Sequence, residues 1–153
     1  MSVMIWRGIS LWTLASLFFI TLANADTRDP SDVLGSWTFQ TQPYRDGACI
    51  MSGTMHLTED PEEGVYDCEL TAVEVCALWG RSVVLQKCSA RRFGNQVSVR
   101  SRISQMLEQE TDGLIYVPDN FTLTIQDASR MYGALVSAAT APVEFRRSED
   151  GVS

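Results

Sequence analysis

Residues 83–103 read VVLQKCSARRFGNQVSVRSRI, and this stretch predicts an antiparallel β-hairpin. Gly94-Asn95 is a two-residue turn signal with glycine first, which suits the tight turns that join antiparallel strands. After the turn, Val97, Val99 and Ile103 alternate with polar residues. That spacing of two is typical of a strand with one buried face. The turn therefore fixes a pairing register for the two strands that flank it.

This register gives the hairpin two different faces. It sets Phe93 opposite Gln96, Ala90 opposite Val99 and Cys88 opposite Ser101. One face is then small and apolar. The other collects four basic side chains, which we call the basic patch: Lys87, Arg91, Arg100 and Arg102. The patch is either an ordinary outer sheet face or a docking surface for an anionic partner, such as an acidic protein or an envelope polysaccharide.

Shorter runs with the same spacing continue along the chain. Strands are predicted at residues 36–42, 50–58, 65–75, 83–93, 96–103, 113–117, 120–126, 131–137 and 143–147. The apolar phase changes after Ala72, which predicts a β-bulge within residues 65–75. Residues 104–111 are polar and form a candidate helix. Eight or nine antiparallel strands in meander order predict an all-β fold, and closure into a barrel would remove exposed sheet edges.

Four cysteines predict two disulfides, because an even number in an exported chain favours pairing. A hairpin that sets Thr58 opposite residue 65 makes Cys49 and Cys76 diagonal neighbours, which leaves Cys68 to meet Cys88. We therefore favour the pairing Cys49–Cys76 and Cys68–Cys88, and the other two pairings stay open. Each bridge would contribute about 2–4 kcal/mol to stability.

The first 25 residues have the parts of a secretory signal peptide. Arg7 supplies an early positive charge, residues 9–22 are apolar and uncharged, and Ala23-Asn24-Ala25 matches the small-x-small cleavage pattern. The apolar run is shorter than the roughly 20 residues of a spanning helix, which favours cleavage after Ala25 over an uncleaved anchor. We expect a single periplasmic or secreted domain at residues 26–153, outside the membrane, with a frayed tail from residue 148.

The charge of the chain limits its partners. The chain has 12 Lys and Arg against 19 Asp and Glu, and a formal net charge of −7. Loss of Arg7 with the signal peptide makes the domain more acidic still. A negative charge of this size disfavours nucleic acid and anionic membrane surfaces as partners.

The triplet Gly35-Ser36-Trp37, shortly after the signal peptide, resembles the Gly-x-Trp signature of lipocalin-like (calycin) barrels. The resemblance implies that Trp37 closes one end of a barrel and that Arg146 or Arg147 packs across its ring, a cation–π contact. The Thr-Asp-Tyr loop of true lipocalins is absent, so the resemblance is to the wider superfamily. A family of small bacterial metalloprotease inhibitors is similar in the same triplet and acts through its free N-terminus.

No group of residues predicts an enzyme, a cofactor or a metal site. His56 is the only histidine and fits an ordinary surface side chain, so neither a Ser/His/Asp nor a Cys/His nucleophile can be assembled. The acids Asp60, Glu62 and Glu63 fit a solvated turn. Asp119 fits an ordinary acid of a polar connection.

Two classes of function remain. The first is a non-enzymatic binding protein, because an eight-stranded barrel has room for a filled core or one small ligand. The side chains expected to line a pocket for a small apolar ligand are Met51, Gly53, Met55, Leu70 and Val99. Gly53 favours a cavity because it adds no side chain, whereas methionine either adapts to a ligand or fills a core. The alternative is a protein-interaction or protease-inhibitor-like module that acts through its outer surface or its N-terminus.

Overall fold

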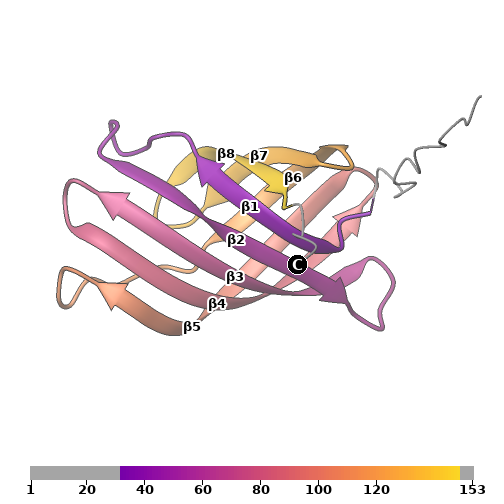
Figure 1. Cartoon of the computed structure of the whole chain (residues 1–153), viewed down its shortest axis with the longest axis horizontal. Coiled ribbons are helices and arrows are strands. Elements are labelled where there is room, and N and C mark those ends of the chain that lie inside the picture. Colours follow the sequence, from indigo (N-terminus) through magenta and orange to yellow (C-terminus); the bar gives the residue numbers. More distant parts are fainter. Residues whose placement is uncertain (1–31, 149–153) are drawn as a thin grey trace, which may run out of the picture.

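The computed structural model describes residues 32–148, which form a closed antiparallel barrel of eight strands in meander order (Figure 1). The strands are β1 (Gly35–Thr41), β2 (Cys49–Glu59), β3 (Val65–Cys76), β4 (Gly80–Phe93), β5 (Gln96–Gln109), β6 (Asn120–Asp127), β7 (Arg130–Val136) and β8 (Thr140–Arg147). Pairing of β1 with β8 closes the barrel, so the predicted all-β meander is confirmed. The predicted signal peptide at residues 1–25 and the tail at residues 149–153 lie outside the described residues. Within residues 32–148, no helix is long and apolar enough to cross a bilayer.

The hairpin of β4 and β5 has the register that its turn predicts. Phe93 pairs with Gln96, Ala90 with Val99 and Cys88 with Ser101. Gly94 has φ +60°, a conformation that glycine adopts without a steric cost. This two-residue turn therefore fixes the register of the longest hairpin in the described chain.

Beyond this hairpin, two predicted elements are wrong. Residues 104–111 are not helical, because β5 continues to Gln109 and pairs with the start of β4. Two register shifts, between Val83 and Val84 and between Leu85 and Gln86, interrupt this part of the pairing. Residues 113–117 are not a strand, because β6 pairs with β5 only from Gln96 to Val99 and leaves them no sheet neighbour. They belong instead to an irregular connection, residues 110–119, that runs over one end of the barrel.

The register predicted between β2 and β3 is wrong by two residues. Thr58 pairs with Asp67 and not with Val65, because the Val65 amide donates to the Glu62 carbonyl (3.1 Å) and Val65 pairs with Arg91 of β4 alone. A shift of two keeps every side chain on its predicted face. It also sets Cys49 directly opposite Cys76 rather than diagonal to it.

The two disulfides are Cys49–Cys76 and Cys68–Cys88, the favoured pairing. Each joins residues that are directly opposite in the sheet, so β3 is tied to both of its neighbours.

The β-bulge predicted in residues 65–75 is absent, since β3 pairs with both neighbours without a register shift. Leu70, Ala72, Glu74 and Cys76 all face the interior, and the alternation continues unbroken. The change of phase in the sequence marks an acid inside the barrel, because Glu74 occupies an inward position.

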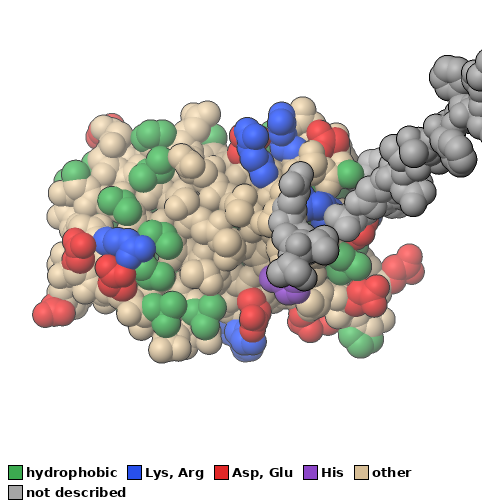
Figure 2. Space-filling view, viewed as in Figure 1, with side chains coloured by type: hydrophobic (Ala, Val, Ile, Leu, Met, Phe, Trp, Pro, Cys, Tyr) green, Lys and Arg blue, Asp and Glu red, His purple; other side chains and the backbone are tan. Residues whose placement is uncertain are grey.

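The middle of the barrel is filled with side chains. Phe39, Phe121 and Phe145 form an aromatic cluster with ring centroids 5.0–5.3 Å apart. Met55 and Leu70 pack in the same core and are almost fully buried. The outer face over β1 and β2 carries mainly uncharged polar side chains and backbone, as the centre of the view in Figure 2 shows.

One end of the barrel is closed around Trp37. The guanidinium of Arg147 lies 4.3 Å from the centre of the Trp37 ring, and Arg147 also donates to the carbonyls of Ala128 and Asp32, both at 2.6 Å. The indole of Trp37 donates to the Val33 carbonyl at 2.9 Å. Of the two arginines expected here, Arg147 therefore occupies the site, and Arg146 is on the outside. The chain is held as far as residue 148, whose amide donates to the carbonyl of residue 36 (2.9 Å).

Candidate functional site

The opposite end of the barrel holds a cavity of about 190 Å³. Its lining residues come mainly from the β1–β2, β3–β4 and β7–β8 connections and from residues 110–119. These connections lie at the left of Figure 1. Its walls combine aromatic, apolar and acidic side chains: Tyr44, Arg45, Met51, Glu74, Trp79, Leu114, Ile115, Tyr116, Val117, Asp119, Leu135, Ser137, Ala138 and Ala139. We call this cavity the open-end site.

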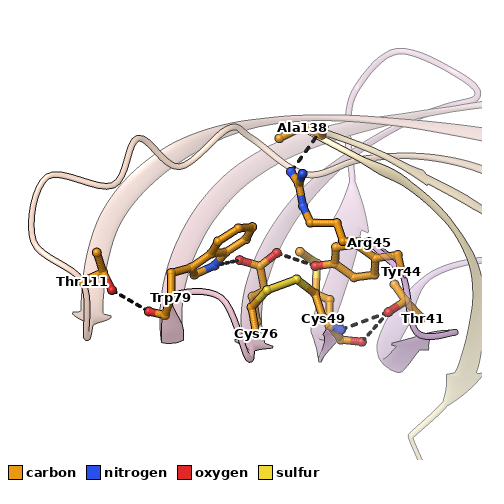
Figure 3. The surroundings of a disulfide bond; sticks show 10 residues. Thr41, Tyr44, Arg45, Cys49, Cys76, Trp79, Thr111 and Ala138 are labelled. Atoms are coloured by element: carbon orange, nitrogen blue, oxygen red, sulfur yellow. Dashed lines mark hydrogen bonds between the residues drawn. A yellow bond between two sulfur atoms is a disulfide. The ribbon is translucent and has the colours of Figure 1, made fainter. Parts of the chain in front are cut away.

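The first wall of the open-end site is built around Glu74. Its carboxylate accepts hydrogen bonds from the Tyr44 hydroxyl and from the Trp79 indole nitrogen, the latter at 2.9 Å. Figure 3 labels the two donors, Tyr44 and Trp79, beside the Cys49–Cys76 disulfide. The chain turns tightly after Tyr44, which pairs with Cys49 through backbone hydrogen bonds of 2.9 and 3.1 Å. The adjacent Cys49–Cys76 disulfide holds this turn against β3. Burial, with smaller contributions from Glu74, raises the pKa of Tyr44, so its hydroxyl stays protonated and remains a donor.

The second wall is built around Asp119, which is fully buried. One carboxylate oxygen, Oδ2, accepts from Gln86 Nε2 (2.6 Å) and from the Tyr116 hydroxyl (2.8 Å). The Asp119 amide donates back to Gln86 Oε1 at 3.0 Å. The other oxygen, Oδ1, has no hydrogen-bond partner among the described residues. An unpaired, buried carboxylate oxygen is costly, so it marks a position where a donor is missing.

The pKa of Asp119 reflects this burial. Removal from water raises the pKa to about 6, and hydrogen bonds from Tyr116 and Gln86 offset part of the effect. The charge of Glu74 adds a smaller increase. The nearby Ser137 hydroxyl donates to the Val117 carbonyl, at 3.0 Å. Asp119 is therefore mostly ionised at pH 7 although water does not reach it.

The rim of the open-end site carries one cation and several exposed apolar side chains. The Arg45 guanidinium lies 5.1 Å from the Trp79 ring centre and donates to the Ala138 carbonyl at 3.4 Å. Ile115 is 86% exposed, and Val117 is 40% exposed. Apolar groups at a rim favour the entry of an organic molecule rather than an ion surrounded by water.

The pocket predicted from the sequence lies mostly in solid core. Only Met51 lines the open-end site, whereas Met55, Leu70 and Val99 are buried away from it. The interpretation of Gly53 is wrong: a Cβ there would lie 2.0 Å from the Thr71 carbonyl oxygen and 2.7 Å from the Phe39 ring. Gly53 thus permits close packing and leaves no empty space.

The basic patch lies on the outside of the barrel and is partly neutralised. Lys87 forms an ion pair with Glu69, and Arg91 forms one with Glu62 at 3.3 Å. Arg100 and Arg102 are exposed and form no ion pair within residues 32–148.

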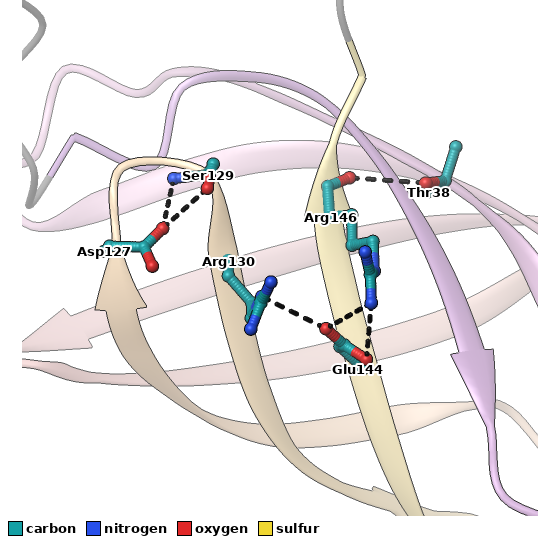
Figure 4. Close-up of polar contacts among 6 residues, drawn as sticks. All are labelled: Thr38, Asp127, Ser129, Arg130, Glu144 and Arg146. Carbon is teal, nitrogen blue, oxygen red and sulfur yellow. Dashed lines mark hydrogen bonds and ion pairs between the residues drawn. The ribbon is translucent and has the colours of Figure 1, made fainter.

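A shallow outer groove of about 850 Å³ runs along β1, β7 and β8. Glu144 lies at its centre between Arg130 (3.2 Å) and Arg146 (3.1 Å), as Figure 4 shows. Its lining mixes polar and apolar surface, and its charged side chains are already paired with one another.

The remaining candidates have ordinary structural roles. His56 is exposed, and its Nδ1 hydrogen-bonds the Ser36 hydroxyl at 2.9 Å. Asp60 caps its turn by accepting from the Glu62 amide at 2.8 Å. In the described part of the chain, no cluster of three or more His, Cys, Asp or Glu could hold a metal ion.

The sequence did not predict that the two acids Glu74 and Asp119 form a site at the open end of the barrel. Glu74 and Gln86 interrupt apolar inward positions of β3 and β4, and this was the available signal. No comparable sequence signal marks Asp119, because its burial depends on the path of residues 110–119 across the end of the barrel.

The geometry defines a class of protein: a closed, eight-stranded antiparallel barrel with a small cavity at one end. No family model and no curated protein matches the sequence. Among solved structures, a redesigned β-barrel matches with a TM-score of 0.54 at 14% identity, covering 76% of this chain and 91% of that one. A de novo designed fluorescence-activating β-barrel matches with a TM-score of 0.49 at 18% identity, covering 75% of this chain and 93% of that one. The match to the redesigned β-barrel shows the barrel fold alone.

Proposed function

We propose that this protein is a non-enzymatic binding protein that holds one small organic molecule in the open-end site. The observation that carries this proposal is a cavity of about 190 Å³ that is lined by two buried acids, Glu74 and Asp119, together with aromatic and apolar side chains. For scale, a cavity of about 150 Å³ in another protein accommodates benzene. The site therefore suits a single-ring molecule at the barrel mouth, not a larger apolar ligand in the barrel centre.

We also propose that the protein acts outside the cytoplasm, after cleavage behind Ala25. Two disulfides favour an oxidising compartment such as the periplasm or the extracellular space. The contact of Arg147 with Trp37 supports a lipocalin-like assignment within the barrel class. Intact mass of the exported protein would test cleavage, since a chain that begins at Asp26 is expected.

Native mass spectrometry of protein purified from the compartment to which it is exported tests the binding function. An excess mass that is lost on denaturation is expected. Ala139→Leu would fill the cavity that Ala139 lines and should remove the excess mass. Ala77→Leu makes the same change at an exposed position outside the cavity and should leave it. A bare chain mass under native conditions, or the same bound mass in both variants, would contradict binding at this site.

A second candidate function is docking of an anionic protein or polysaccharide on the outer surface. It rests on Arg100 and Arg102, which remain without an acidic partner in residues 32–148, whereas the rest of the basic patch is paired. Replacing both with glutamine should then abolish capture of an acidic polysaccharide and leave the open-end site unchanged. The protease-inhibitor-like function considered from the sequence would act through the N-terminus of the mature chain. Those residues lie outside the described range, 32–148.

A further inference from the structure

The charge of the open-end site departs from that of an apolar pocket. Glu74 and Asp119 bring two carboxylates to one small cavity, and among its lining residues the one cation is Arg45. Arg45 lies at the rim, where its guanidinium already contacts the Trp79 ring and the Ala138 carbonyl. The lining of the cavity is therefore acidic, with its one cation held at the rim.

The hydrogen bonds of the two carboxylates are unequal. Glu74 accepts from Tyr44 and Trp79, one donor on each oxygen. Asp119 accepts both of its donors on Oδ2, and Oδ1 has none. Because Asp119 is fully buried, water in bulk cannot satisfy that oxygen. A cation in the cavity would offset the charge of this carboxylate without touching Oδ1, which a water-sized group does not reach.

The rest of the wall suits the body of an organic cation. Tyr44, Trp79 and Tyr116 surround the carboxylates with aromatic rings, which attract ammonium groups through their faces. Met51 and Leu135 add apolar surface on the barrel side. A bare metal ion fits less well, because it needs several oxygen ligands and the described residues offer no cluster of three.

We infer that the ligand of the open-end site is a small organic ammonium ion, with a ring-sized apolar body and a positive charge that the carboxylates of Asp119 and Glu74 attract. This inference rests on the proposed binding function and specifies the chemistry of its ligand. Arg45 at the rim disfavours a second positive charge on the ligand, so a monocation is the expected species.

Three probes of nearly equal size and shape isolate the charge: benzylamine, benzyl alcohol and benzoate. Each carries one ring and one substituent, and they are cationic, neutral and anionic at pH 7.5. Isothermal titration of the mature, oxidised protein with each probe measures the preference directly. Benzylamine should bind at least tenfold more tightly than benzyl alcohol, about 1.4 kcal/mol, and benzoate should bind most weakly.

The variant Asp119→Asn removes the charge and keeps the shape, so it should reduce the preference for benzylamine over benzyl alcohol to less than threefold. Asp127→Asn makes the same change at the exposed end of β6 and should keep the full preference. A circular dichroism spectrum matching the wild type shows that each variant is folded. The comparison of probes on the wild type does not depend on either variant.

The outcomes separate the two proposals. If benzyl alcohol or benzoate binds as tightly as benzylamine, the ammonium inference is wrong and the binding function stands. If Asp119→Asn keeps the preference for benzylamine, the assignment to Asp119 is wrong. If none of the three probes binds at millimolar concentration, the small-molecule function of the site is refuted, and the inference falls with it.

Discussion

The substitution Asp119→Asn should change the pH dependence of stability, because Asp119 is fully buried with one unpaired oxygen. Burial raises the pKa of Asp119 from 3.8 to about 6 in the native state. Between these two values the native protein retains a proton that the unfolded chain has lost. The free energy of unfolding therefore falls as the pH rises through this range, which is opposite to the usual behaviour of a paired carboxylate.

The size of the effect follows from the two pKa values. One pKa unit corresponds to about 1.4 kcal/mol, so full ionisation of Asp119 costs the native state about 3 kcal/mol. Most of this cost, about 2.5 kcal/mol, develops between about pH 4 and about pH 7. Asparagine does not ionise, so the Asp119→Asn variant lacks this ionisation cost at every pH.

Urea unfolding with the disulfides intact, followed by tryptophan fluorescence at several pH values from 4 to 7, measures the difference between Asp119→Asn and wild type. The stability of the variant relative to wild type should rise by about 2–3 kcal/mol from the lowest to the highest pH. Asp127→Asn is the control with the opposite sign, because hydrogen bonds from Ser129 lower the pKa of Asp127. A difference between Asp119→Asn and wild type that is constant with pH would refute the assigned burial and charge.

Three further changes test the packing. Gly53→Ala should destabilise the barrel by about 1–3 kcal/mol in chemical denaturation, because the alanine methyl group would overlap the Phe39 ring. An unchanged denaturation midpoint would show that the core has room at this position. Arg147→Lys should cost about 1–3 kcal/mol and alter the fluorescence of Trp37, since lysine cannot cover the indole and donate to the same carbonyls. Reduction of both disulfides should lower the unfolding free energy by about 2–4 kcal/mol for each bridge, and an equal stability of oxidised and reduced protein would argue against them.

The sequence by itself determined the strands, their order and most of the pairing. Alternation of apolar and polar residues assigns faces without reference to the rest of the fold, because side chains on a strand alternate with a period of two. The Gly94-Asn95 turn fixed the register of β4 and β5, since a two-residue loop leaves no freedom in the pairing. The longer turn between β2 and β3 did leave such freedom, and there the predicted register was wrong by two residues.

Only the tertiary structure decided where the cavity lies and what lines it. The predicted pocket residues are inward, as their alternation implies, but Phe39 and its aromatic neighbours fill the centre of the barrel. Whether an inward side chain lies in the filled core or beside the cavity depends on side chains that are distant in the sequence. The local alternation of apolar and polar residues contains no information about them. Asp119 is the clearest case: in the sequence it is an acid of a polar connection, and residues 110–119 bury it by crossing the barrel end against Gln86. Local sequence sets which way a side chain points, whereas the packing of remote segments sets whether water reaches it.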